Sequence, residues 1–534
     1  MLSNLKSKWP ALTVCCVALL TMSISAAAPS AKALHLSHAE YEDRVQAVWS
    51  AQIVAVLLTW PFEHQTASTL WIDHYPRQWT NAPVDDDWYY EMCAVRGFEK
   101  YGIGMTAGQL GEQWKANACG SWGSSEQARL LLARGVKAPD SGHPRYNRLW
   151  FTIGPQFSGD VYGALAPGLP NVAGRMAREY GHVNGYAEGT DGTVFVAGIV
   201  SLAFAEKDAK MIVRKAARLI HPDSPYRQCL DMMVRLADEG KSFEEIAQAV
   251  EDRWHIEYPA TNNAVANGGL VAVSVWFGDG DFLKTVNLAA RAADFTDADC
   301  NAANAAAVVG AMHGMKCLPA PLVAALGDRI KGGQMGPVQL TPPVDETISG
   351  LAQRTAMIGG KILLANGASL NGDLITIPTQ EPITQPAELF KLADLTRYWN
   401  VDWQLERAGF GGAGVGMGGI RGSTYLDGDV LATYPRDEVR GLVLRRTLKL
   451  SEQPALSFQA GADAGRAWEL NVYANNKLLD KRIIDGGTDT RRWHEVKVDL
   501  SEFAGQKVRL RLYQRVLAPN RLAGNAYWKA LRVE

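Results

Sequence analysis

Apolar residues recur with a helical period over residues 39–365. In this part of the chain they fall three and four positions apart, and Gly, Pro and Asn separate one such segment from the next. Helices are therefore predicted at 39–58, 91–101, 123–134, 172–180, 193–206, 208–220, 243–253, 264–277, 282–294, 301–315 and 344–364. The later segments are rich in Ala and Gly, which suits close contact between helices. The pattern indicates an all-helical domain.

The period changes after a join at 366–394, where turn formers replace the helical pattern. From 395 to 534 the apolar residues alternate in short runs, with a turn indicated at Asn475–Asn476. The runs are Leu442, Leu444 and Leu448; Leu456 and Phe458; Trp468, Leu470 and Val472; Val496, Val498 and Leu500; and Val508, Leu510 and Leu512. Short alternating runs between turns are typical of an antiparallel sandwich. We therefore expect a multidomain protein whose second domain is an all-β sandwich.

Residues 1–28 have the pattern of an export signal. Lys6 and Lys8 precede a short apolar stretch at 11–22, and small residues follow at 23–28. The alternative is a membrane anchor, but the stretch is short for a span of about 20 residues. We expect cleavage, no stable transmembrane segment afterwards, and a secreted or periplasmic protein.

Composition narrows the possible partners. The 534 residues are 47% hydrophobic and 21% charged, with a formal net charge of -2. The overall charge therefore does not favour a nucleic-acid partner. Cysteines 93, 119, 229, 300 and 317 remain after the signal, and none has zinc-ligand spacing. Because their number is odd, at least one should be free or paired between chains.

Two acidic clusters stand where helices are expected to begin. Asp85, Asp86 and Asp87 precede one helix, and Asp297 and Asp299 precede another. Either cluster could be a helix cap, because Asp accepts backbone N–H bonds there. One Asp suffices for a cap, however, and several together repel one another unless a cation neutralises them. Carboxylate ligands of this kind suit Mg²⁺ or a similar hard ion.

The order of these motifs resembles that of the ADP-ribosylglycohydrolase superfamily, which includes the dinitrogenase-reductase-activating glycohydrolases and the crystallin J1-like proteins. The resemblance runs from Tyr41 to about Leu364. It begins with Tyr41-Glu42-Asp43-Arg44-Val45 through Pro61-Phe62-Glu63, followed by Asp85-Asp86-Asp87. It continues with Thr261-Asn262-Asn263 and Gly278-Asp279-Gly280-Asp281, and closes with Asp297-Ala298-Asp299-Cys300-Asn301. The C-terminal domain resembles galactose-binding modules, which implies an all-β jelly-roll sandwich.

The resemblance implies an all-α fold with two Mg²⁺ ions at the base of a cleft. Its metal ligands would be Asp85, Asp86, Asp87, Asp297 and Asp299. Cys300 stands where the family often has Thr or Ser, and a thiol is a poor Mg²⁺ ligand, so it is left out. Glu63 would act on the scissile bond with help from Asp86. Substrate contacts are expected from Asp160, His182, Asn184, Asn262, Asn263 and Trp88, each of which could instead be structural.

Three functions follow from these expectations. The first is an exported Mg-dependent glycosidase acting on a glycan or glycoconjugate, which export, the attached sandwich and the bulky Trp88 favour. The second is removal of ADP-ribose from a protein or small molecule, the best-known reaction of the family. The third is a non-catalytic glycan-binding protein, against which the intact acidic clusters and Glu63 speak.

Overall fold

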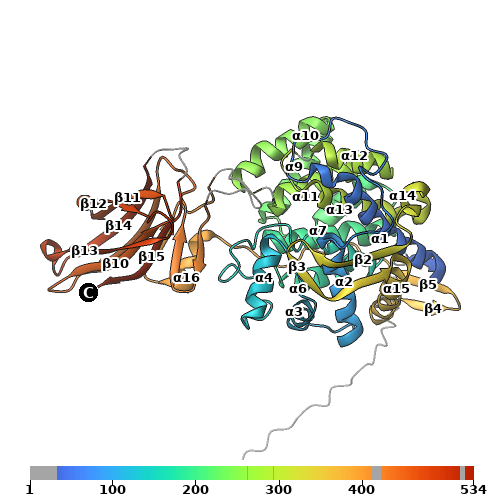
Figure 1. The fold of residues 1–534 in the computed structure, drawn as a ribbon, viewed down its shortest axis with the longest axis horizontal. Helices are drawn as coiled ribbons and strands as arrows, with labels where there is room; N and C mark the ends of the chain where they lie inside the picture. The colour runs from blue at the N-terminus through green and yellow to red at the C-terminus, as the bar shows by residue number, and fades with distance from the viewer. Residues whose placement is uncertain (1–32, 261, 293, 412–421, 518–522) are drawn as a thin grey trace, which may run out of the picture.

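The computed structural model describes residues 33–260, 262–292, 294–411, 422–517 and 523–534. The expected export signal at 1–28 and Thr261 lie outside these residues. The described chain forms a helical domain followed by a β-sandwich, and the two lie side by side along the longest axis (Figure 1). The predicted fold class, an all-helical domain followed by an all-β domain, is confirmed.

The helical domain is built around helices that are buried on nearly every side. Its helices are α1 His38–Thr59, α2 Asp86–Tyr101, α3 Ala107–Ala116, α4 Gly123–Ala133, α5 Gly159–Ala164, α6 Pro170–Gly181, α7 Glu188–Ala203, α8 Ala209–Ala217, α9 Pro225–Asp238, α10 Phe243–Val250, α11 Ala264–Gly278, α12 Phe282–Ala292, α13 Ala298–His313, α14 Ala320–Ala324 and α15 Ile348–Ala365. Short 3-10 turns at Trp60–Phe62 and Met315–Cys317 end α1 and α13, and a π-helical turn at Glu251–His255 ends α10.

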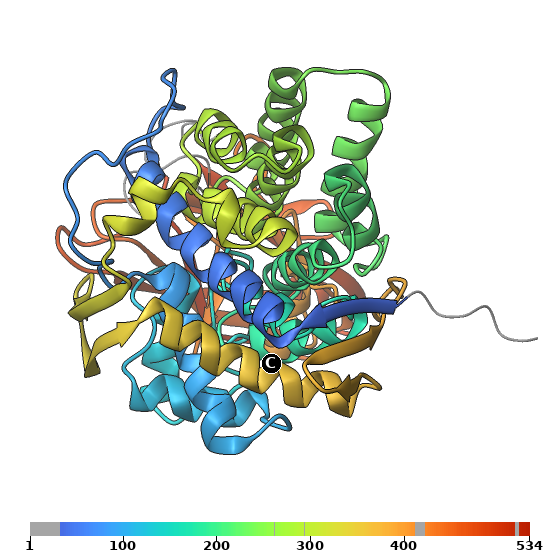
Figure 2. The same ribbon diagram turned by 90° about the vertical axis from the view of Figure 1, so that its right-hand side faces the viewer.

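Helix α1 is the central element of this domain. Among the described residues, the segment His38–Phe62 is the one helical stretch long and apolar enough to cross a membrane. Its most apolar window is 78% buried inside the protein, however, which is the property of a core helix. Helix α1 packs against α13. It also lies alongside α15, and in Figure 2 α1 is the blue helix and α15 the gold one. Gly310 permits the first contact, because a Cβ at this position would lie 2.6 Å from the Ala47 carbonyl oxygen.

Two small β elements interrupt the helical pattern. Strands β2 Arg329–Met335 and β3 Val338–Thr347 form a hairpin, and β4 Ser369–Asn371 and β5 Leu374–Pro378 pair with β1 Ala33–Ser37. The helix predicted at 344–364 was therefore too long at its start. Strand β3 runs to Thr347, whose side chain accepts the backbone N–H of Gly350 and begins α15. The join expected at 366–394 likewise contains β4 and β5, which belong to the helical domain.

The C-terminal domain consists of two five-stranded antiparallel sheets, in the orders β13-β10-β15-β8-β7 and β12-β11-β14-β9-β6. The strands are β6 Gln404–Glu406, β7 Tyr425–Asp427, β8 Val430–Thr433, β9 Leu442–Lys449, β10 Ala455–Ala462, β11 Ala467–Ala474, β12 Lys477–Asp485, β13 Arg492–Asp499, β14 Lys507–Val516 and β15 Ala526–Val533. The predicted alternation sets the register, since Leu512 pairs with both Leu444 and Val472, and all three are buried between the sheets. Helical pieces in this domain are short, at Leu392–Leu395, α16 Thr396–Trp399 and Ser501–Phe503.

Candidate active site

A pocket of about 190 Å³ opens in the helical domain where two helices begin. Five of its lining residues are carboxylates: Glu63, Asp85, Asp86, Asp297 and Asp299. The other walls are formed by Trp122, Gly123, Ser124, Ser125, Thr152, Ile153, Gly154, Phe157, Asn262 and Cys300. The structure therefore brings together acidic residues that are separated by more than two hundred positions in the sequence.

Backbone pairing holds Glu63 beside the second acidic cluster. Glu63 follows the 3-10 turn that ends α1, where the chain leaves the core. The next residue, His64, donates its backbone N–H to the Thr296 carbonyl at 2.8 Å, and Phe295 donates to the Gln65 carbonyl at 2.7 Å. These two bonds fix Glu63 at the start of α13, and its side chain remains 40% exposed.

The first acidic cluster supplies one cap and two further carboxylates. The Asp85 side chain accepts the backbone N–H of Asp87 at 3.4 Å and so caps α2. Asp86 and Asp87 occupy the first turn of the same helix, and one oxygen of each of the three residues lies within 4.8 Å of the others. The capping explanation therefore accounts for Asp85 and leaves Asp86 and Asp87 unexplained.

The second cluster does not cap its helix through a side chain. Asp297 holds the N-cap position of α13 but makes no capping bond. Its Oδ2 accepts a hydrogen bond from Asn262 Nδ2 at 2.6 Å, and its backbone N–H donates to Asn267 Oδ1 at 3.2 Å. Ligand atoms of Asp297, Asp299 and Cys300 lie within 4.8 Å of one another.

The electrostatics of the pocket are unfavourable for so many negative charges. Burial, followed by the charges of neighbouring carboxylates, raises the pKa of Asp86, Asp87 and Asp299 well above the ordinary value. Burial, and then the charges of Asp297 and Asp85, raise the pKa of Glu63 to about 8. Among the described residues no Lys or Arg lines this pocket. The cluster therefore calls for a positive charge that the chain itself does not supply.

The donor atoms fit a hard cation. Asp87 Oδ1, Asp297 Oδ1, Asp299 Oδ1 and Thr296 Oγ1 are buried without a hydrogen-bond partner among the described residues. Buried polar atoms are normally paired, so unpaired carboxylate oxygens at one place point to a missing ligand. All of them are oxygen atoms, which is the donor type that Mg²⁺ and Ca²⁺ prefer. Cys300 differs, because burial raises its pKa and its thiol donates to Asp87 Oδ2 at 3.3 Å.

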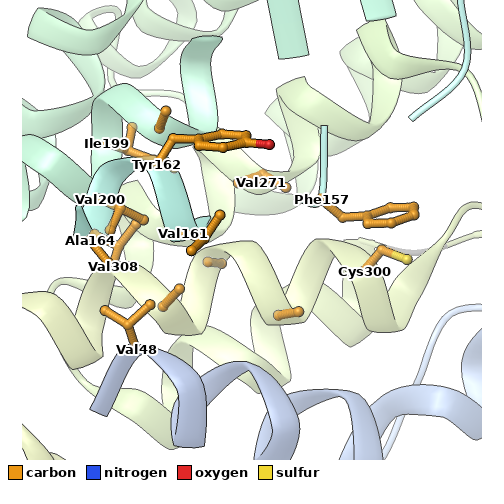
Figure 3. Close-up of a cluster of buried hydrophobic side chains, with 14 of the residues drawn as sticks. Val48, Phe157, Val161, Tyr162, Ala164, Ile199, Val200, Val271, Cys300 and Val308 are labelled. Atoms are coloured by element: carbon orange, nitrogen blue, oxygen red, sulfur yellow. The ribbon is translucent and has the colours of Figure 1, made fainter. Parts of the chain in front are cut away.

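The wall opposite the carboxylates is neutral and partly apolar. Ser124 and Ser125 stand in the first turn of α4, and Gly154 lets the neighbouring loop approach them, because a Cβ there would lie 2.3 Å from Ser124 Oγ. Phe157 and Cys300 lie at the end of the apolar cluster that includes Val161 and Val308 (Figure 3). The hydrophobic core therefore reaches the pocket directly and supports its floor.

The expected substrate-binding residues lie in several different places. Asn262 lines the pocket, and Asn184 stands behind it, donating from Nδ2 to Ser125 Oγ at 2.9 Å. Asn263 does not line it, because its side chain caps α11 through the backbone N–H of Ala266. Trp88 is fully buried and donates to the Pro83 carbonyl at 3.2 Å, so its indole does not line the pocket either.

Two further candidates are also absent from the pocket wall. Asp160 is buried in the core, where its Oδ2 accepts from Asn304 Nδ2 at 3.0 Å. His182 contacts Glu388 at 2.6 Å between Nε2 and Oε2, on the segment that leads to the sandwich.

Several wall residues were not singled out from the sequence. Ser124, Ser125 and Thr152 line the pocket, yet none belongs to a cluster of charged residues. The available signal was the predicted helix start at residue 123, since a helix N-terminus collects polar side chains and free N–H groups. Trp122 is held from behind by the β2–β3 turn, where it packs against Gly336.

Comparison with known proteins places these features in a family. Residues 37–358 match the family model described as ADP-ribosylglycohydrolase. A solved structure titled as an ADP-ribosylglycohydrolase-related protein complex aligns at 14% identity over 60% of this chain and 99% of its own, with a TM-score of 0.39. A structure titled for the structure and function of CBM4 aligns at 11% identity over 25% of this chain and 85% of its own, with a TM-score of 0.18. The search of curated proteins found no match.

Proposed function

Because the chain belongs to the ADP-ribosylglycohydrolase family, a metal-dependent family of glycosyl-bond hydrolases, we propose that it is an exported, Mg²⁺-dependent hydrolase of a glycan or glycoconjugate. The observation that carries the metal requirement is the set of unpaired, buried carboxylate oxygens around one pocket. Export, which residues 1–28 suggest, would place the enzyme among extracytoplasmic glycans.

The carboxylates divide into two groups by their surroundings. Two Mg²⁺ ions would be held by Asp86, Asp87, Asp297 and Asp299. Asp85 caps α2 and would complete the ligand set. When bound, the ions would neutralise this cluster and polarise the hydroxyl groups of a sugar. A pure binding protein has little use for so large an uncompensated charge.

Glu63 is the residue best placed to move a proton. It stands at the rim of the pocket, where burial, followed by the charges of Asp297 and Asp85, raises its pKa to about 8. A protonated carboxyl can donate to the leaving oxygen of a glycoside, and the resulting carboxylate can accept a proton from water. Asp86 lines the same pocket and could assist in either step. Phe157 and Ile153 exclude bulk water from one side.

Product analysis tests the proposal. The purified full chain with Mg²⁺ would be incubated with a panel of glycans and, separately, with ADP-ribosylated protein and ADP-ribosylated small molecules. Release of a sugar from a glycan, abolished by EDTA and restored by Mg²⁺, is the expected result. Release of ADP-ribose alone would instead establish the second candidate, which the family match favours. Binding of glycans without hydrolysis, with Mg²⁺ present, would contradict both.

A further inference from the structure

A second pocket lies between the two domains, with a cavity volume of about 480 Å³. Both domains line it. Trp150 and Tyr258 come from the helical domain, Phe390 from the connecting segment, and Phe410 from the start of the sandwich. Trp150 and Tyr258 are buried, while Phe390 and Phe410 are partly exposed and give the pocket an apolar wall against which a sugar ring or a nucleobase can pack.

The aromatic rings of this interdomain pocket are held in place by their neighbours. The Tyr258 hydroxyl donates to Glu188 Oε1 at 2.9 Å, and Glu188 is buried. Phe410 packs on Phe151 with 4.4 Å between ring centroids, and Trp150 packs on Phe390 at 5.3 Å. The lining is therefore formed before any ligand arrives.

The charge of the interdomain pocket is opposite to that of the acidic pocket. Arg253, Lys391, Arg407 and Arg436 line it, against a single carboxylate, Glu257. Arg436 pairs with Glu257 at 3.5 Å. Within the described chain the other three cations make no ion pair with a carboxylate. An anionic group would therefore be attracted here and repelled from the carboxylates of the acidic pocket.

The two pockets are separated by a single layer of backbone. Trp150 lines the interdomain pocket while Thr152 and Ile153 line the acidic one, and three residues of chain span at most about 11 Å. On the facing segment Tyr258 lines one pocket and Asn262, four positions later, lines the other, and four residues span at most about 14 Å. The Ile153 backbone N–H donates to the Asn262 carbonyl at 2.8 Å and joins the two segments. The two linings are therefore close together along the chain, within the length of an extended oligosaccharide or nucleoside diphosphate sugar.

We propose that the interdomain pocket is a second subsite, which binds an anionic group carried by the same substrate whose glycosyl bond is cut in the acidic pocket. This inference rests on the proposed function for the bond that is cut. The recognised chemistry is a negative charge beside a flat ring, which either a carboxylated or sulfated sugar or a nucleoside diphosphate supplies. A neutral glycan would lack the charged contacts.

Calorimetric titration tests the subsite without turnover. In EDTA, the full chain would be titrated with trigalacturonate, its neutral methyl ester, a sulfated galactose disaccharide and ADP-ribose. Lys391→Met with Arg407→Met removes two unpaired cations of the pocket. Lys361→Met with Arg175→Met is the matched control, since both residues are exposed and neither lines the pocket.

At least one anionic probe is expected to bind, and to bind about 10- to 100-fold more weakly to the pocket variant than to wild type or to the control. Which probe responds identifies the source of the charge. Equal affinity in wild type and pocket variant, or binding by none of the three anionic probes, would overturn the subsite. The subsite would also be overturned if Asp299→Asn no longer bound the anionic probes while the pocket variant still bound them.

Turnover separates this subsite from the proposed function. On an anionic glycoside with Mg²⁺, the pocket variant is expected to raise KM and leave kcat unchanged. Hydrolysis with an unaltered KM would remove the subsite and leave the proposed function standing. Charge-dependent binding without hydrolysis of any glycan would contradict the proposed function and leave the subsite standing.

Discussion

At the scale of single residues, the carboxylates of the acidic pocket differ because their surroundings differ. Glu63 is partly exposed at the rim, while Asp297 and Asp299 are nearly inaccessible to solvent. A rim carboxyl can exchange protons with substrate and water. The buried carboxylates cannot do so freely, but they can hold an ion in a fixed place.

Glu63→Gln should therefore lower the rate while keeping metal and substrate. The amide has the shape of the carboxyl group but cannot cycle a proton, so kcat should fall by about 10²–10⁴. Mg²⁺ affinity, measured by calorimetric titration, should stay within about threefold of wild type, because other carboxylates hold the ions. Near-normal turnover would remove Glu63 from the mechanism and move the role to Asp86, which lines the same pocket.

Asp299→Asn should change stability in opposite directions with and without metal. In EDTA the variant should be more stable than wild type by about 1–3 kcal/mol, because burying the Asp299 carboxyl without a cation costs free energy, whether it stays charged beside its neighbours or takes up a proton. In Mg²⁺ the variant should be less stable than wild type, because a metal ligand has gone and ion binding contributes less to the stability of the folded state. Thermal unfolding in both conditions measures this.

Asp294→Asn is the matched control for that substitution, since Asp294 is exposed and lies in the same segment. It should behave like wild type in EDTA and in Mg²⁺. A loss of stability in EDTA for Asp299→Asn would show that the cluster is held by internal contacts and has no need of an ion.

At the scale of elements, the position of the acidic pocket depends on how closely α1 and α13 pack. Glu63 follows the end of α1, and Asp297 and Asp299 begin α13. A change in the contact between the two helices would therefore move Glu63 relative to the second cluster, although the contact at Gly310 lies far along α13 from the pocket.

Gly310→Ala should disrupt this contact. The added Cβ would meet the Ala47 carbonyl oxygen at 2.6 Å, and overpacking of this kind costs about 1–3 kcal/mol. Gly360→Ala is the control, because a Cβ at this position in α15 meets nothing within 4 Å and should add about 0.5–1 kcal/mol of helix stability. Chemical denaturation compares the two variants.

The connecting segment is also held against the helical domain by one partly buried acid, Glu388. Glu388 accepts hydrogen bonds from the Ala187 backbone N–H at 2.7 Å and from His182 at 2.6 Å, and lies 3.5 Å from Arg178. Burial alone would raise the pKa of Glu388, but the hydrogen bond from His182 and the charges of His182 and Arg178 outweigh it and lower the pKa to about 2.

Glu388→Gln should therefore lose about 3 kcal/mol at neutral pH. Because the folded pKa is depressed, the contribution of Glu388 is present above its ordinary pKa and is lost as pH falls towards 2. The difference between wild type and variant should thus shrink between about pH 5 and pH 2 in urea unfolding. Glu381→Gln, 68% exposed on the same segment, should show neither effect. A constant difference across this pH range would contradict the ion-pair account.

Sequence patterns predicted the elements better than the contacts within the site. Alternation and helical period depend on neighbours a few positions away, so α1, α11, α13 and most strands of the sandwich were predictable. The meeting of the two acidic clusters depends on tertiary packing, and only the family-like order of motifs indicated it. Which side of a helix faces the pocket was not predictable, and this is why Trp88 is found in the core and Asn263 at a cap.

At the scale of the whole molecule, the sandwich is attached beside the active site. Phe410, at the beginning of the sandwich, packs on Phe151, and the residues that follow Phe151 line the acidic pocket. The cores of the two domains share Phe390 and Leu392 as bordering residues. The sandwich thus forms part of the surroundings of the site and is more than an appended module.

Phe410→Ala should uncouple the two domains. The lost ring contacts with Phe151 and Tyr258 should weaken the interface by about 1–3 kcal/mol, since Phe410 is only partly buried. Calorimetric unfolding should then show two transitions further apart than in wild type, because each domain retains its own core but loses the stabilisation it received from the other. Val401→Ala, 77% exposed in the sandwich domain, should leave the transitions unchanged.

The loss of packing in Phe410→Ala should also raise KM for an anionic glycoside, because Phe410 lines the interdomain pocket. If Phe410→Ala separates the transitions but leaves KM unaltered, the interface serves only to join the domains. If the substitution changes neither the transitions nor KM, the contact between Phe410 and Phe151 does not help to hold the two domains together.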